Sequence, residues 1–270
     1  MGPLRRPRPA PATIPPRVRD NPPQDNERVM TATRLRNAYI EELNRALGPP
    51  VHKSVNAAQI RGMLHDARDG DPILYEEPDK KTWIWSDLHL GHETSIGAFG
   101  RPFHTAQAAD KAMQRAWVER VAEDDTIVCL GDITADGCLQ PHHMLRWQQA
   151  PGRKVLVLGN HDVDPINRIE HLDIQQQALA LVAPGDPPLL LTHVPLIQVP
   201  HGTVNIHGHI HDKQSPTPNL HINVSVEQLN YAPVKLKDVR RLARRLLERR
   251  NVYAGERTER RLYIVKTTMP

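Results

Sequence analysis

From residue 82 onward, short β-rich apolar runs alternate with helical segments, and this alternation constrains the fold more than any other feature. The runs that predict strands are residues 83–85, 127–130, 155–158, 189–191, 204–206 and 222–226. Between the first two runs, apolar residues share one helical face at Ala109, Met113, Ala116, Trp117 and Val121. A β-α-β unit of this kind needs a sheet covered on both faces, so the sequence predicts an α/β domain.

Polar residues follow five of these runs directly, at the positions where the predicted strands end. They are Asp87 and His89, then Asp132, then Asn160, His161 and Asp162, then His193, and finally His209 and His211. Loops at the carboxyl ends of strands in an open α/β sheet converge on one crevice. We therefore expect these side chains to meet in a single site.

The spacing within the clusters favours metal binding. In Asp87-x-His89 and His209-x-His211, an extended backbone would place both side chains on the same side, so that each pair could chelate an ion. Glycines at 131, 159 and 208 would let the backbone turn sharply and approach a small ion closely. Carboxylate, imidazole and amide oxygen donors suit Mn²⁺, Fe²⁺ or Zn²⁺.

The order D-x-H, G-D, G-N-H-D, H and G-H-x-H over residues 83–212 resembles the calcineurin-like metallophosphoesterase superfamily. Residues 86–92, 101–103 and 205–226 further resemble its small stand-alone bacterial and phage phosphoesterases. The resemblance implies a four-layer α/β/β/α sandwich and two divalent metal ions, with Mn²⁺ or a mixed pair expected. One ion would be held by Asp87, His89, Asp132 and His211, and the other by Asp132, Asn160, His193 and His209, so that Asp132 bridges them.

A site of this kind predicts a phosphoesterase that acts on a small phosphodiester or phosphomonoester, such as a nucleotide or a cyclic nucleotide. A metal-bridging hydroxide would attack phosphorus in line. His161 would protonate the leaving oxygen or stabilise the charge on phosphorus, and Asp162 would orient His161. The alternative for His161 is a hydrogen-bonded loop histidine without a chemical role.

His92 and Arg101 lie on the loop after the first metal motif and are candidate contacts for a substrate phosphate. An alternative exists for each residue. Arg101 can instead pair with an acid, and His92 can instead hydrogen-bond a group that supports a metal ligand.

Four segments are expected. Residues 1–30 form a disordered arm, because eight prolines fall within the first 23 residues and large apolar side chains are scarce. Residues 31–75 form a helical hairpin with a packing or helix-turn-helix role, and residues 76–236 form the catalytic core. Residues 237–270 contribute a basic amphipathic helix and a terminal strand at 262–265.

Charge is distributed unevenly along the chain. Residues 1–36 hold eight arginines against three acids, residues 235–270 hold twelve basic residues against four acids, and residues 37–234 have a net charge of −9. An acidic centre suits cation binding. The basic termini are either solvated faces or contacts to nucleic acid, and the second reading makes a nuclease the alternative function. An inactive nucleic-acid-binding scaffold is a further alternative, although all seven ligand positions are filled.

The sequence offers no apolar segment typical of a secretory signal or a membrane span. Its two cysteines, Cys129 and Cys138, provide neither a disulfide framework nor a metal-binding pair. We therefore expect a soluble cytoplasmic protein without a membrane partner.

Overall fold

A computed structural model describes residues 74–162, 165–196, 199–248 and 256–267 of the chain. The arm predicted for residues 1–30 and nearly all of the hairpin predicted for 31–75 therefore lie outside the described residues. Among the described helices, none has the length and apolar character that crossing a membrane requires.

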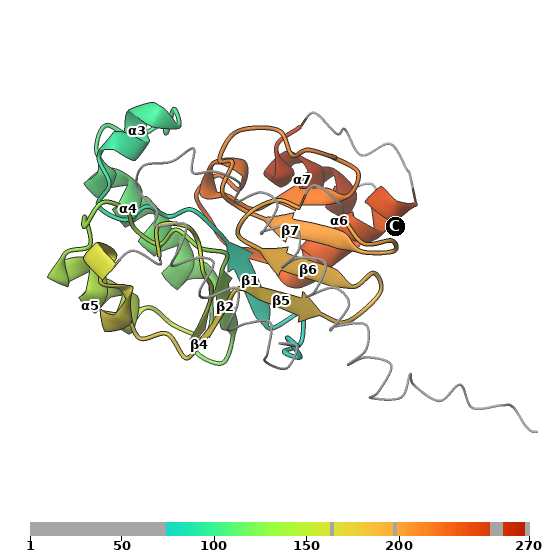
Figure 1. The fold of residues 1–270 in the computed structure, drawn as a ribbon, viewed down its shortest axis with the longest axis horizontal. Helices are drawn as coiled ribbons and strands as arrows, with labels where there is room; N and C mark the ends of the chain where they lie inside the picture. The colour runs from blue at the N-terminus through green and yellow to red at the C-terminus, as the bar shows by residue number, and fades with distance from the viewer. Residues whose placement is uncertain (1–73, 163–164, 197–198, 249–255, 268–270) are drawn as a thin grey trace, which may run out of the picture.

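Two β-sheets form the centre of the domain (Figure 1). The first has the strand order β4 (Gln176–Ala178), β3 (Arg153–Val157), β2 (Thr126–Cys129), β1 (Thr82–Trp85) and β9 (Val234–Lys235). The second has the order β5 (Ala180–Ala183), β6 (Leu189–Thr192), β7 (Val204–His207) and β8 (His221–Asn223). Only β9 and β5 pair antiparallel with their neighbours, so the other strands of each sheet end at a common edge.

Helices lie on both sides of the sheets, as the expected layered α/β fold requires. Figure 1 shows one group on one side, α3 (Thr94–Ala98), α4 (Ala106–Arg120) and α5 (Pro141–Gln149), and a second group on the other, α6 (Leu236–Leu247) and α7 (Thr258–Thr267). The main apolar core runs from Met113 of α4 through Ile84 and Val128 of the first sheet to Ile206 of the second and Val239 of α6. The fold is the mixed α/β architecture that the sequence predicted.

The predicted helix around residues 109–121 is confirmed as α4, and its sequence explains its limits. The side chain of Thr105 accepts a hydrogen bond from the backbone N–H of Ala108 and so caps the first turn. Met113 and Trp117, spaced four residues apart, are buried. The Trp117 ring packs edge-on against Trp85 of β1, with the ring centroids 5.4 Å apart, and this contact attaches the helix to the sheet.

Two expectations about secondary structure need correction. The predicted terminal strand at 262–265 is part of helix α7, in which Thr258, Arg261 and Leu262 are buried at helical spacing while α7 packs on α6. The run predicted as a strand at 222–226 is strand only over His221–Asn223. After that point the chain leaves the second sheet, and the N–H of Val226 donates to the carbonyl of Ser86 at the end of β1. This crossing joins the two sheets beside the polar clusters.

Candidate metal centre

The loops that follow β1, β2, β3, β6 and β7 meet where the two sheets adjoin, and they carry all seven predicted metal ligands. Six of these ligands fall into two compact groups, in each of which the donor atoms lie within 4.8 Å of one another. The first group contains Asp87, His89 and His211, and the second contains Asp132, His193 and His209. Each group contains three of the four residues in one of the ligand sets that the resemblance implied.

Asn160, the seventh predicted ligand, completes the second group. Its side-chain oxygen lies 3.0 Å from Nε2 of His193 and 2.9 Å from Nδ1 of His209. These two histidine nitrogens are themselves 3.2 Å apart. Three donors therefore converge on one small volume, as the coordination of a single cation requires.

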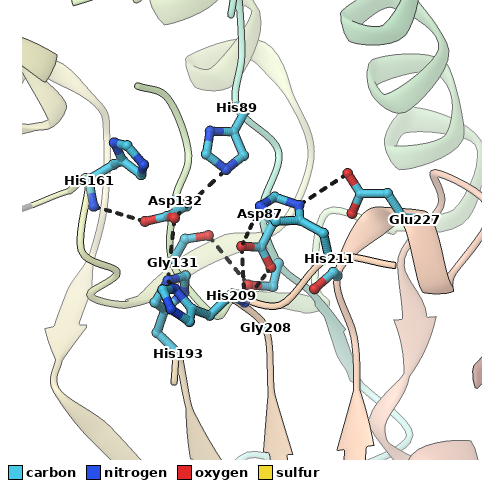
Figure 2. A network of polar contacts seen from close by, with 12 residues as sticks. Asp87, His89, Gly131, Asp132, His161, His193, Gly208, His209, His211 and Glu227 are labelled. Atoms are coloured by element: carbon cyan, nitrogen blue, oxygen red, sulfur yellow. Dashed lines mark hydrogen bonds and ion pairs between the residues drawn. The ribbon is translucent and has the colours of Figure 1, made fainter. Parts of the chain in front are cut away.

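Asp132 connects the two groups, as Figure 2 shows. One of its carboxylate oxygens, Oδ2, lies 3.3 Å from Nε2 of His193 and 3.7 Å from Nε2 of His89, a member of the first group. The other oxygen, Oδ1, accepts a hydrogen bond from the backbone N–H of His161 at 3.0 Å. This placement suits a carboxylate that bridges two cations.

The polar atoms of the site are buried in a way that fits a bound cation. Asp87 and Asp132 are 0% and 2% exposed, and both ring nitrogens of the buried His89 have no hydrogen-bond partner within the part of the chain that the structure describes. Buried carboxylates and unpartnered imidazole nitrogens are costly unless something compensates them. A pair of divalent cations would compensate both, so the donor set fits the expected metals.

The pKa values of two histidines in the site also fit a bound cation. Burial opposes protonation of His193, but the adjacent Asp132 carboxylate outweighs burial and raises the pKa of His193 to about 10. Burial lowers the pKa of His89 far below its ordinary value, so that its imidazole is neutral and its lone pair is available. A cation bound beside Asp132 would take the place of the proton on His193, because ligating imidazoles must be neutral.

Glycine is required at two of the predicted positions, because a larger residue would collide with a ligand. A Cβ atom at Gly208 would overlap Ser86 Oγ and the Asp87 carboxylate, and a Cβ atom at Gly159 would overlap the Asp132 carboxylate. These glycines therefore let the backbone lie close to the ligand carboxylates, and close approach of the backbone to an ion stays a prediction.

The expected extended backbone at the two His-containing pairs is wrong. Asp87, His89, His209 and His211 all have positive φ angles, of 62°, 50°, 69° and 52°. Left-handed backbone of this kind costs about 1–3 kcal/mol at a non-glycine residue and concentrates at functional sites. The side chains of each pair are therefore directed by a sharp turn after the strand rather than by strand alternation.

Asp162 is placed differently from the prediction. Its carboxylate accepts hydrogen bonds from the backbone N–H groups of Asp132, Ile133 and Gly159 at 2.8, 3.1 and 2.9 Å, and no described contact joins it to the ring of His161. Burial raises the pKa of Asp162 to about 6, so it is still an anion at neutral pH. Asp162 therefore fixes the two ligand loops to each other and does not orient the imidazole.

Arg101 pairs with an acid, the alternative that the sequence left open, and does not reach a substrate phosphate. Its side chain is 1% exposed, Nε donates to Glu227 at 2.9 Å, and Nη2 lies 2.8 Å from the same carboxylate oxygen. The remaining donors reach the backbone oxygens of Leu88 and Asp87 at 2.8 and 2.7 Å. Arg101 thus braces the turn that carries Asp87 and His89.

His92 approaches another acid, with its Nε2 atom 3.3 Å from Asp136. Burial lowers the pKa of His92, so the ring is predominantly neutral at pH 7. Contact between His92 and a substrate phosphate stays a prediction.

Sequence reasoning missed two residues. Glu227 is buried, and its carboxylate lies 3.3 Å from Nδ1 of His211, which leaves Nε2 of that histidine facing Asp87 (Figure 2). The ring of Phe99 stacks on His211, with the centroids 3.4 Å apart. Glu227 follows directly after the stretch at 205–226 that resembled phosphoesterases, and an acid at that position was the available signal.

A solvent-open hollow of about 830 Å³ lies over these ligands. Phe99, Asp132, Asn160, His161 and His211 line it. The His161 ring packs edge-on against the ring of His89, with the centroids 5.3 Å apart, so it stands at the border between the ligands and the hollow. A substrate in the hollow would have access to both ligand groups and to His161.

Comparison with known proteins agrees with this geometry. The model of the calcineurin-like phosphoesterase family matches residues 80–248. The Gene 66 protein of Mycobacterium phage L5 is 30% identical over 170 residues, which cover 52% of this chain and 82% of the phage protein. An uncharacterized protein of Methanocaldococcus jannaschii is 27% identical over 163 residues, which cover 58% of this chain and 88% of the archaeal protein.

A similar fold is found in the crystal structure of a protein of unknown function from Aquifex aeolicus. The two structures have a TM-score of 0.50 at 22% sequence identity, over 60% of this chain and 98% of the other. Because the family model covers the strands, the ligand loops and helix α6, the chain belongs to the calcineurin-like phosphoesterase family.

Proposed function

We propose that the chain is a dinuclear metal-dependent phosphoesterase that hydrolyses small phosphodiesters or phosphomonoesters. The observation that carries this proposal is the position of Asp132, whose Oδ2 atom faces both ligand groups beneath an open hollow. Asp87, His89, Asp132 and His211 would hold one cation, and Asp132, Asn160, His193 and His209 the other. The cations, when bound, lower the pKa of a water molecule and offset charge on the phosphoryl oxygens.

The protein's own residues would then divide the remaining work. Glu227 holds the His211 ring in place through Nδ1, and the carbonyl of Leu130, 2.6 Å from Nδ1, does the same for His193, so that both Nε2 atoms are directed into the site. His161 stands at the edge of the hollow, where its ring can deliver a proton to the departing oxygen. Its backbone N–H fixes Asp132 at the same time.

A leaving-group comparison tests the role of His161. We expect His161→Asn to lower kcat by about 10²–10⁴-fold on an alkyl phosphodiester, whose departing oxygen needs a proton. The loss should be much smaller on a p-nitrophenyl ester, because p-nitrophenolate departs without protonation. Mn²⁺ affinity should stay unchanged, and His171→Asn, at an exposed histidine, should alter neither property. Equal losses on both esters would contradict proton delivery by His161.

Substrate class is tested by a screen with added Mn²⁺. Phosphomonoesters, linear and cyclic phosphodiesters and oligonucleotides are compared, with Asp132→Ala and excess chelator as controls. We expect turnover of a small phosphoester that both controls abolish. Preferred turnover of oligonucleotides, falling steeply with salt, would instead support the nuclease alternative. No turnover of any substrate would refute the proposed function.

A further inference from the structure

A second, smaller hollow of about 470 Å³ adjoins the candidate metal centre on the side of helix α7. Asp212 and Lys213, directly after the ligand His211, line both hollows. The second hollow is also lined by Asn223 and Gln228, whose side-chain amides donate to the backbone oxygen of His211 at 2.8 and 3.1 Å. The two hollows therefore lie next to each other, on either side of the segment that follows His211.

Arg261 of α7 lines the hollow, and its guanidinium is a buried charge without a paired acid among the residues that the structure describes. The residue is 4% exposed, and Nη2 donates to the backbone oxygen of Pro218 at 3.0 Å. Nε is buried without a hydrogen-bond partner, and no acid among the described residues contributes to the pKa of the guanidinium. Buried arginines normally have a paired acid, because an uncompensated buried charge is costly.

Burial lowers the pKa of Arg261 to about 10, so the guanidinium still carries its charge at neutral pH. This contrasts with Arg101, the other buried arginine beside the metal centre, whose charge is neutralised by Glu227. The hollow that Arg261 lines is the side from which a compensating anion would approach the guanidinium.

The charges of the other residues that line the hollow also favour binding of an anion. Lys213 and Arg257 add two positive charges, and the first turn of α7, which begins at Thr258, lines the hollow with the positive end of its dipole. Two exposed acids, Asp212 and Glu256, also lie on the lining, so cations exceed acids by one. A guanidinium, an ammonium and a helix N-terminus together form a combination suited to phosphate.

We propose that this hollow is a subsite for a second phosphate group of the substrate, held by Arg261 while the scissile phosphate occupies the metal centre. The inference rests on the proposed function and narrows its substrate class to phosphoesters that carry another phosphate. The family match ends at residue 248, whereas Arg257 and Arg261 belong to the segment beyond it. Specificity for a second phosphate would thus depend on residues that lie outside the region shared with the family.

Two substrates that differ only in the second phosphate provide the kinetic test. Thymidine 5′-(p-nitrophenyl phosphate) is compared with the same compound carrying a 3′-phosphate, with Mn²⁺ and the full chain. We expect wild type to prefer the second compound in kcat/KM. Arg261→Gln should reduce that preference by about 10- to 100-fold, because it removes charge-assisted hydrogen bonds to phosphate, while kcat/KM on the first compound is retained. Arg260→Gln, an exposed neighbour on the same helix, should leave the preference intact.

Arg257→Gln provides a second variant, because an exposed residue can be changed without disturbing the fold. It should reduce the preference in the same direction as Arg261→Gln, and that reduction keeps the test decisive if Arg261→Gln does not fold. Absence of a preference in wild type, or a preference that survives both substitutions, would overturn the subsite. Equal losses on both substrates would overturn it too, because they indicate a structural role for Arg261.

Binding of inorganic phosphate to chelator-treated protein separates the subsite from the proposed function. Calorimetry should detect phosphate binding in wild type and in Arg260→Gln, and binding should be at least 10-fold weaker in Arg261→Gln or Arg257→Gln. If wild type hydrolyses neither thymidine compound but shows this binding pattern, the proposed function fails while the anion site stands. Phosphate binding that is the same in all four proteins overturns the site.

Discussion

Replacing Glu227 by glutamine should destabilise the protein far more than the same change in a surface ion pair. Glu227 and Arg101 have side chains that are 2% and 1% exposed, and they form an ion pair of 2.8 Å with a hydrogen bond of 2.9 Å from Nε. Glutamine preserves the shape but leaves the guanidinium buried without a counter-charge. Breaking a buried pair by removing one partner costs about 3–5 kcal/mol.

Urea unfolding in the presence of a chelator measures this cost without a contribution from bound metal. Glu77→Gln is the matched control, because Glu77 pairs with Arg153 at 3.0 Å on the surface, and an exposed pair contributes about 0–1 kcal/mol. The double variant Arg101→Met with Glu227→Gln should be more stable than the sum of the two single changes predicts, since neither charge remains alone.

Metal titration provides a second readout, because Glu227 also orients the His211 ring. Loss of such a supporting contact typically weakens metal binding by about 10–100-fold. The reasoning would be refuted if Glu227→Gln unfolded at the same urea concentration as Glu77→Gln, or if the two single changes were additive in the double variant.

Two further predictions concern the start of β2 and the glycine behind Asp87. Burial itself raises the pKa of Asp125, but hydrogen bonds from Trp83 and Lys235 hold that pKa below its ordinary value. The ionised carboxylate therefore stabilises the fold above about pH 4, and this stabilisation is lost as the pH falls through the lowered pKa. Asp125→Asn should therefore cost about 1–3 kcal/mol at pH 7 and less at pH 3 in urea unfolding, and an equal cost at both pH values would contradict this linkage. Gly208→Ala should abolish metal binding, because the added Cβ overlaps the Asp87 carboxylate, whereas Gly97→Ala, with nothing within 4 Å of the added atom, should bind metal normally. Normal metal titration of Gly208→Ala would show that the turn can adapt.

The sequence predicted that the candidate ligands would lie together because its signals are local. Each ligand cluster directly follows an apolar run, and strands that pair in parallel bring their carboxyl ends to one edge regardless of the details of packing. Order and spacing therefore predicted that these side chains would meet, whereas their division into two sets bridged by Asp132 came from the family resemblance and stays a prediction.

The features that sequence reasoning missed depend on distant contacts or on backbone geometry. Arg101 and Glu227 are 126 residues apart, and no local pattern links them. The β-branched content of residues 262–265 favoured a strand, but packing against α6 selects a helix there. The left-handed turn at Asp87 and His89 was also hidden, because its cost is offset by contacts from other loops, such as the N–H of His209 donating to Asp87.

Counting bound Mn²⁺ ions tests the dinuclear centre most directly. Calorimetric titration of chelator-treated wild type should give two Mn²⁺ ions per chain, and electron paramagnetic resonance should show the two ions magnetically coupled. Asp132→Asn should lose the coupling and weaken both binding events, whereas Asp124→Asn, at an exposed carboxylate, should match wild type. Binding of a single Mn²⁺ ion to wild type, or two coupled ions in Asp132→Asn, would contradict a centre bridged by Asp132.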